Sequence, residues 1–283
     1  MSILILLAAP DRVSIPLLPL WTVAAILVAA ALGVFRPRTI LGPRRLRPGE
    51  SPRILIAIIA FTLAAWALAE LAMGTAHQRI LKMHRQPPTA PLSSDEIVVY
   101  GTVIDAAALG AMVMMTMSRP QGFKRMGINL PRLPRGLLGG IFALAIVLPL
   151  IIYLDALVQM ALQWLNKAPQ PHDLLEILKS HPARWLKAAD IFSAVALAPL
   201  AEEMFFRGLV QTALRHLLNR PWPAVILTAA FFALVHRWWT WPQIFFLGIC
   251  LGYVYERSGN LWMSVAMHAA FNLTSMWLFV HFG

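Results

Sequence analysis

Residues 137–154 read LLGGIFALAIVLPLIIYL, an uncharged run that continues as a mostly apolar stretch to Leu165. A helix needs about 20 mostly apolar residues to cross the hydrocarbon core of a bilayer. The run shows no alternation of apolar and polar residues, and backbone groups in hydrocarbon must pair within their own segment. The stretch therefore predicts a transmembrane helix.

The same measure finds further spans along the chain. It gives eight candidates: Ile15–Phe35, Ile54–Met73, Ile97–Met117, Leu137–Leu165, Ala188–Leu214, Pro223–Trp239, Gln243–Tyr255 and Leu261–Val280. The predicted fold class is therefore all-α, a polytopic membrane protein with about eight transmembrane helices. We expect a multi-pass integral protein of the plasma or inner membrane.

The composition of the chain agrees with this fold class. Hydrophobic residues make up 59% of the 283 residues and charged residues 13%, against roughly 45–50% and 25% in soluble proteins. A soluble fold of this size could not bury so much apolar surface, and a disordered chain needs low hydrophobicity. Both classes are excluded.

The net charge of +11 indicates contact with lipid. Basic loops beside apolar spans are expected next to anionic membrane lipid, so membrane lipid is a predicted partner and nucleic acid is not. Cys250 is the single cysteine, which excludes an intrachain disulfide and a metal site built on several cysteines.

Ionisable residues inside the predicted spans are concentrated in the C-terminal third. An ionisable group in a span is costly and usually faces a cavity or a partner. Glu203 and Arg207 are four residues apart, so they share a helix face and can form an ion pair. Glu202 points about 100° away from Glu203. It is therefore the carboxylate that remains for chemistry.

Polar residues on two later spans can join this group. His236 lies near the end of the sixth span, and His268 and Asn272 share a face of the eighth. The least costly arrangement turns all these side chains toward one polar, hydrated cavity. Four more acidic residues in or near the spans receive no role from the sequence and fit either a cavity or an interface: Glu70, Asp105, Asp155 and Asp190.

The polar residues form three motifs that resemble a known family. The motifs are Glu202-Glu203-x-x-x-Arg207, Phe232-x-x-x-His236 and His268-x-x-x-Asn272. Together they are similar to those of the CAAX protease and bacteriocin-processing (CPBP) family, which includes the eukaryotic type II CAAX prenyl endopeptidases. The stretch from Gly248 to Ser264 is also similar.

The resemblance implies an all-helical intramembrane endopeptidase, with residues 1–187 forming N-terminal helices and basic loops and residues 188–283 the catalytic helices. In the family the first glutamate, here Glu202, activates water, and the histidine of the second motif, His236, helps to hold it. His268 and Asn272 would stabilise the oxyanion. Glu203 and Arg207 would hold the catalytic residues in place without contacting the substrate. The substrate would be a peptide or a lipid-modified protein.

The resemblance leaves the cofactor open. Zinc could be held by Glu202, His236 and His268, because zinc accepts glutamate and histidine ligands. However, the chain has no His-Glu-x-x-His sequence, which places two zinc ligands on one helix. A water activated by the glutamate alone is the alternative, and we favour this metal-free site.

Two other functions compete with peptide hydrolysis. A non-catalytic bacteriocin-immunity or scaffold protein of the same family would use the cavity for binding alone, but none of the three motifs is degraded. A transporter or proton relay could also use buried Glu and His. It lacks the paired, interrupted helices that transporters commonly show in two halves.

Overall fold

The computed structural model describes residues 23–24, 27, 51–167, 177–178 and 183–282. Within these residues every regular element is helical and no strand occurs, so the predicted all-α fold is confirmed. The first predicted span, Ile15–Phe35, lies almost entirely outside the described residues.

Six long or medium helices form the frame. They are α2 (Pro52–Met83), α3 (Ser94–Met117), α5 (Leu133–Trp164), α10 (Pro221–Leu234), α11 (Trp241–Ser258) and α12 (Leu261–Phe282). Short turns connect them: α4 (Gly122–Arg125), η1 (Leu130–Arg132) and η4 (Trp238–Thr240). A continuous helical rod runs through α7 (Arg184–Phe192), η2 (Ser193–Leu197), α8 (Ala198–Glu203), η3 (Met204–Gln211) and α9 (Thr212–Leu218).

The described part of the chain contains four helical segments long and apolar enough to cross a membrane: Pro52–Met83, Ser94–Met117, Gly122–Trp164 and Leu261–His281. Their outward side chains are apolar, with Leu68 66% and Leu138 72% exposed, as a lipid environment requires. The chain is therefore an integral membrane protein. α10 is apolar but has only 14 residues. It spans about 21 Å, short of a core of about 30 Å.

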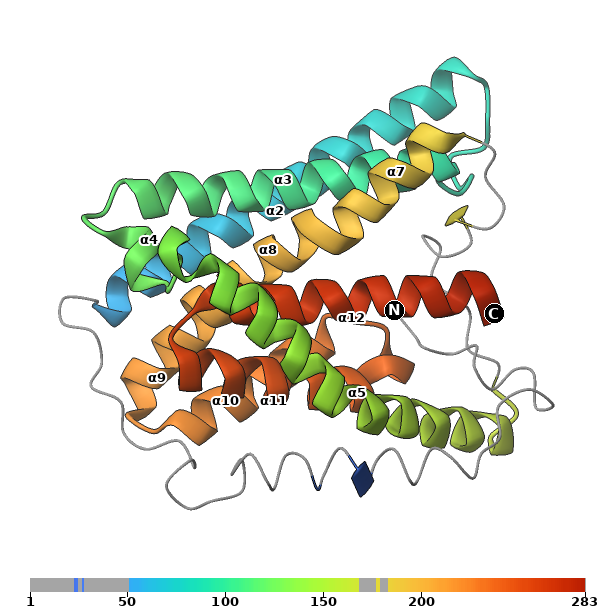
Figure 1. Cartoon of the computed structure of the whole chain (residues 1–283). Coiled ribbons are helices and arrows are strands. Elements are labelled where there is room, and N and C mark those ends of the chain that lie inside the picture. The colour runs from blue at the N-terminus through green and yellow to red at the C-terminus, as the bar shows by residue number, and fades with distance from the viewer. Residues whose placement is uncertain (1–22, 25–26, 28–50, 168–176, 179–182, 283) are drawn as a thin grey trace.

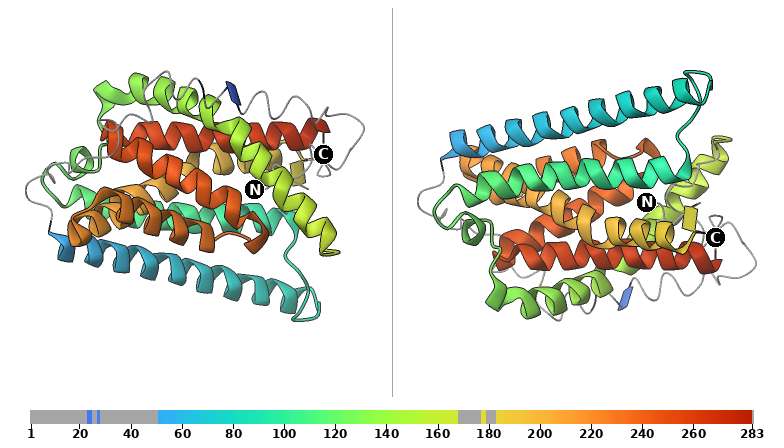
Figure 2. Two further views of the ribbon diagram at one scale, coloured as in Figure 1. Left: turned by 90° about the horizontal axis from the view of Figure 1, so that it is seen from below. Right: turned by 90° about the horizontal axis from the view of Figure 1, so that it is seen from above.

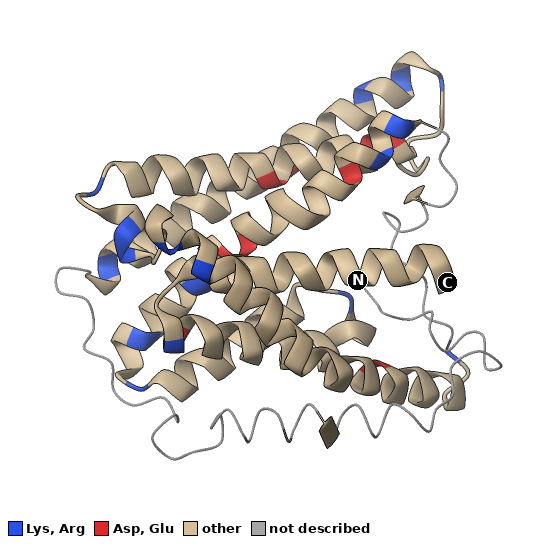
Figure 3. Ribbon diagram, viewed as in Figure 1, with Lys and Arg blue, Asp and Glu red and all other residues tan. Residues whose placement is uncertain are grey.

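Basic and acidic residues occupy different places along the helices (Figure 3). Lysine and arginine colour mainly the ends of the helices and the connections, whereas a few acidic residues lie within helices. The acidic residues inside the helices are therefore the exceptions that need an explanation.

α2 and α3 form an antiparallel hairpin along one side of the molecule (Figures 1 and 2). Ser93 caps α3, because its side chain accepts from the Glu96 backbone N–H and the Glu96 carboxylate accepts from the Ser93 N–H at 2.9 Å. His77 Nδ1 also donates to Glu96, at 2.9 Å. This contact explains why α2 continues to Met83, ten residues beyond the predicted end at Met73.

The first part of the rod, from α7 to α8, lies between α3 and α12, whereas its last helix, α9, packs against α10 and α2 (Figures 1 and 2). α12 packs along α5, and α10 packs along α11. The three segments that carry the sequence motifs are neighbours, because α8 packs against α12 and η3 packs against α10, and α3 packs against α8 as well.

Gly252 of α11 shows how tightly these helices pack. A Cβ at this position would lie 2.7 Å from Gln211 Oε1 and 3.1 Å from a Val225 methyl, and Gln211 Nε2 donates to the Gly252 carbonyl at 3.1 Å. The position joins η3, α10 and α11, and only glycine fits without displacement.

We expect Gly252→Ala to lower the free energy of unfolding by about 1–3 kcal/mol, because overpacking must displace Gln211. Gly110→Ala in α3 is the matched control, since no atom lies within 4 Å of its Cβ, and alanine should stabilise the helix by about 0.5–1 kcal/mol. Chemical unfolding of the purified protein in detergent measures both. Equal stability of the two variants would contradict the packing argument.

Candidate active site

The two adjacent glutamates lie where the rod departs from α-helical geometry. π-helical segments Ser193–Leu197 and Met204–Gln211 flank the short helix α8 that ends at Glu203. Pro199 has no N–H to donate and its ring crowds the carbonyl four residues earlier, which accounts for the altered hydrogen bonding on its N-terminal side. π-helical turns occur frequently at functional sites.

Glu203 is completely buried and joins two partners. Its Oε2 lies 3.2 Å from Arg207 Nε and its Oε1 lies 3.1 Å from His268 Nδ1. The ion pair with Arg207 is the one that the spacing predicts. The contact with His268 was not predicted, because it joins residues 65 apart in the chain.

Arg207 is also completely buried. Its Nη2 donates to the Gly248 carbonyl at 3.4 Å, and its guanidinium lies 4.7 Å from the centre of the Phe232 ring. The Arg207 side chain therefore ties η3 to α10 and α11 and neutralises Glu203 away from the cavity.

Glu202 faces a different direction from Glu203, as the helical geometry predicts. Its side chain is 32% exposed and its Oε2 lies 3.9 Å from His268 Nε2. Among the described residues, this oxygen has no hydrogen-bond partner. Glu202 is thus the one carboxylate of the pair that reaches open space.

His268 is held between the two glutamates. A carboxylate can only accept, so Nδ1 carries the proton in the contact with Glu203, and Nε2 is turned toward Glu202. Glu203 thereby fixes the orientation of the ring, as a carboxylate commonly does for a functional histidine.

His236 does not lie on a helix, which corrects the predicted span Pro223–Trp239. α10 ends at Leu234, and His236 Nδ1 bonds to the Phe232 carbonyl at 2.6 Å. In a longer helix the Phe232 carbonyl would accept the backbone N–H of His236. The His236 side chain therefore competes with the helix for this carbonyl. Because a carbonyl only accepts, Nδ1 carries the proton in this contact.

Asn272 lies on α12 with His268 and is buried. Its Nδ2 donates to the Ala194 carbonyl at 2.7 Å, within the π-helical turn η2. A side-chain amide has two N–H donors, so this bond anchors the residue and leaves a second donor.

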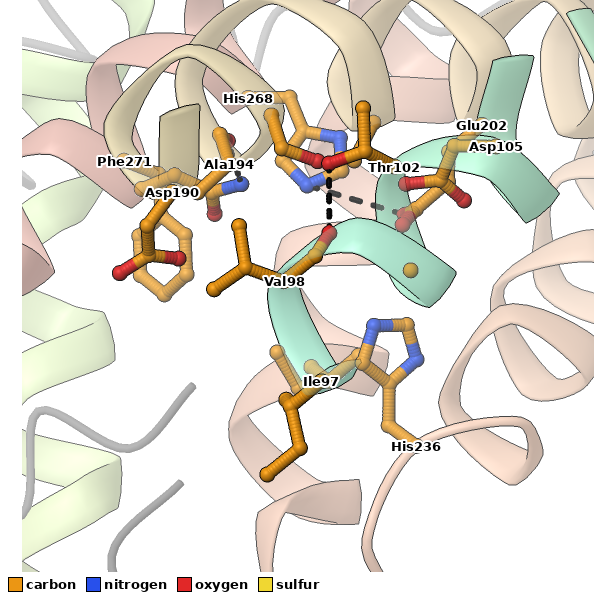
Figure 4. Close-up of a pocket in the computed structure, with 15 residues that line it drawn as sticks. Ile97, Val98, Thr102, Asp105, Asp190, Ala194, Glu202, His236, His268 and Phe271 are labelled. Atoms are coloured by element: carbon orange, nitrogen blue, oxygen red, sulfur yellow. Dashed lines mark hydrogen bonds and ion pairs between the residues drawn. The ribbon is translucent and has the colours of Figure 1, made fainter. Parts of the chain in front are cut away.

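A cavity of about 320 Å³ brings the predicted residues together (Figure 4). Glu202, His236, His268 and Asn272 all line it, whereas Glu203 and Arg207 do not. Asp105 from α3 and Asp190 from α7 also line it, and sequence reasoning assigned neither a role. The signal available for both was the cost of an ionisable residue inside a predicted span.

A second cavity of about 300 Å³ adjoins the first, because Asp105, Glu202 and His236 line both. Its other lining residues are mainly apolar or aromatic: Leu63, Trp66, Ala108, Met112, Ala201, Phe205, Phe206, Phe231 and Val235, with Thr62. Glu202 therefore stands between a polar and an apolar compartment.

The described side chains do not fit a metal ion. Zinc needs several histidine, cysteine or acidic ligands at about 2.0–2.3 Å, and no three such side chains in the described part of the chain are grouped closely enough. Glu202, His236 and His268 share a cavity but do not form that ligand set.

Comparison with known proteins agrees with the motifs. Residues 184–274 match the family model described as "Type II CAAX prenyl endopeptidase Rce1-like". No curated protein and no solved structure matches the chain. The matched segment begins with the rod, ends in α12 and contains all six motif residues, so this part of the chain is similar to the type II CAAX prenyl endopeptidases.

Proposed function

We propose that this protein is an intramembrane endopeptidase that hydrolyses a peptide bond with a water molecule activated by Glu202. One observation carries the proposal. Glu202 is a carboxylate without an arginine or lysine partner that faces a polar cavity, while the adjacent Glu203 is neutralised behind it. A general base needs this combination of reach and available lone pairs.

In the proposed step, Glu202 takes a proton from water and the hydroxide oxygen attacks the carbonyl carbon of the substrate. The carbon–nitrogen bond then breaks, and Glu202 returns the proton to the leaving nitrogen. His236 accepts a hydrogen bond from the water through Nε2, since its Nδ1 proton is engaged by the Phe232 carbonyl.

The oxyanion is stabilised by His268 and Asn272. A protonated His268 donates from Nδ1 to Glu203 and from Nε2 into the cavity. Asn272 offers the amide N–H that is not used by Ala194. Donors placed at an oxyanion each contribute about 2.7–4 kcal/mol to catalysis.

We further propose that the substrate carries a lipid group beside the scissile bond. The family description names prenyl endopeptidases, and the aromatic side chains of the second cavity offer an apolar surface next to Glu202. The protein would act as a multi-pass protein of the plasma or inner membrane, where lipid-modified proteins are anchored.

Terminal proteomics tests the function. We expect cells with the wild-type protein to contain new carboxyl termini on membrane-associated proteins, and cells with Glu202→Gln to lack them at equal protein abundance. An unchanged set of termini would contradict the proposal, and a protective phenotype retained by Glu202→Gln would favour an immunity role.

Chelation tests the cofactor. We expect 1,10-phenanthroline to change the rate of cleavage by less than about twofold, because the described residues do not group as metal ligands. Cleavage of a substrate identified by proteomics gives the rate, and elemental analysis of the active protein gives the metal content. Loss of activity that zinc restores would contradict the metal-free mechanism.

A further inference from the structure

Asp190 has fewer hydrogen-bond partners than its buried carboxylate requires. It is 0% exposed, and neither carboxylate oxygen has a hydrogen-bond partner among the described residues. By contrast, the buried Asp155 of α5 accepts a hydrogen bond from Gln243 at 2.9 Å. Buried carboxylates are costly unless they are paired, so Asp190 is a candidate to pair with a cationic group that enters the cavity.

The cavity as a whole has an excess of negative charge. Asp105, Asp190 and Glu202 line it together with two histidines, and none of the described lining residues is a lysine or an arginine. The nearest buried cation on the rod, Arg207, is paired with Glu203 and lies outside the lining. A complementary ligand therefore carries positive charge.

Asp190 and Glu202 lie at different ends of this space. Figure 4 shows Asp190 beside Ala194 and Phe271, whereas Glu202 lies beside Asp105. The two acids are twelve residues apart on one continuous helical rod, which corresponds to about 18 Å at an α-helical rise. An extended peptide covers that distance with about five residues.

We propose that Asp190 forms a subsite that binds a lysine or arginine side chain of the peptide substrate, about five residues from the scissile bond. This inference rests on the proposed endopeptidase function. The cationic side chain would enter the end of the cavity near Ala194 and Phe271 and pair with the Asp190 carboxylate, and the pair would position the peptide bond at Glu202.

A peptide-retention experiment tests the subsite without requiring cleavage. The full-length Glu202→Gln protein in nanodiscs is incubated with ten-residue peptides that are randomised except for one lysine, arginine or norleucine, and retained peptides are sequenced by mass spectrometry. We expect retention of the lysine and arginine peptides to exceed that of the norleucine peptides by about tenfold or more. Equal retention, whether high or at background, overturns the proposal.

Two variants in the Glu202→Gln background locate the effect. Asp190→Asn should abolish the preference for cationic peptides, and Asp155→Asn should leave it unchanged because Asp155 does not line the cavity. A preference that persists in Asp190→Asn overturns the assignment to Asp190. If that variant does not fold, the comparison of lysine with norleucine peptides still decides whether a cationic subsite exists.

Cleavage by the wild-type protein separates this inference from the proposed function. Cleaved peptides without a basic residue near the fifth position from the cut would overturn the subsite and leave the endopeptidase intact. Selective retention of cationic peptides without cleavage by the wild-type protein would support the subsite and contradict the endopeptidase.

Discussion

Glu202→Gln is expected to lower kcat by about 10²–10⁴-fold, because the amide cannot accept the proton of water as a general base does. KM should remain within a few-fold of the wild-type value, since the variant keeps the shape of the side chain and loses an interaction made in the transition state. The measurement is steady-state cleavage of an identified substrate by purified protein in nanodiscs.

A second glutamine variant controls for the substitution itself. Glu70 of α2 is exposed and does not line the cavity with Glu202, so Glu70→Gln should retain wild-type kcat. Both variants should also keep the wild-type melting temperature. A Glu202→Gln protein that is folded and retains more than about a tenth of wild-type kcat is incompatible with the proposed base.

Arg207→Met is expected to reduce the free energy of unfolding by about 3–5 kcal/mol, because it removes the guanidinium that pairs with the buried Glu203 carboxylate. Arg207 is completely buried and also loses its bond to Gly248 and its contact with the Phe232 ring. Chemical unfolding in detergent gives the value. Arg53→Met, at an exposed arginine of α2, is the matched control and should change stability by less than about 0.5 kcal/mol.

The double variant Glu203→Gln/Arg207→Met separates loss of charge pairing from loss of packing. Replacement of both members of a buried ion pair is often close to neutral, unlike removal of one. We therefore expect the double variant to be more stable than Arg207→Met. If the two unfold at the same denaturant concentration, the stability of this region does not depend on the ion pair.

The sequence predicted the fold class because the bilayer imposes a simple rule. Long apolar runs became α2, α3, α5 and α12, since backbone groups in hydrocarbon must be satisfied within a helix. The rule says less about helix ends. α2 continues past its apolar part because His77 bonds to Glu96, a contact that depends on the position of α3.

The C-terminal helices were less predictable for a related reason. The π-helical turns on both sides of α8 and the end of α10 at Leu234 depend on local competition for hydrogen bonds. The side chain of His236 occupies a carbonyl that a continuing helix would use. Hydropathy indicates whether a segment lies in lipid or in water, and it does not detect competition for a hydrogen bond.

The candidate site was predictable in part. Spacing along one helix predicted the ion pair of Glu203 with Arg207 and the different direction of Glu202. The contact between Glu203 and His268 joins two helices and could not be read from spacing. Asp190 was visible as an ionisable residue inside a predicted span, but its lack of a partner among the described residues is a property of the packed structure.

Oxygen labelling in a single turnover tests the central claim most directly. Excess wild-type protein cleaves its substrate once in water enriched in ¹⁸O, and mass spectrometry locates the label. If Glu202 activates water, the new carboxyl terminus carries one ¹⁸O atom after the first turnover and Glu202 carries none. Label in the Glu202 carboxylate with an unlabelled product would show that Glu202 acts as a nucleophile, and would contradict the proposed mechanism.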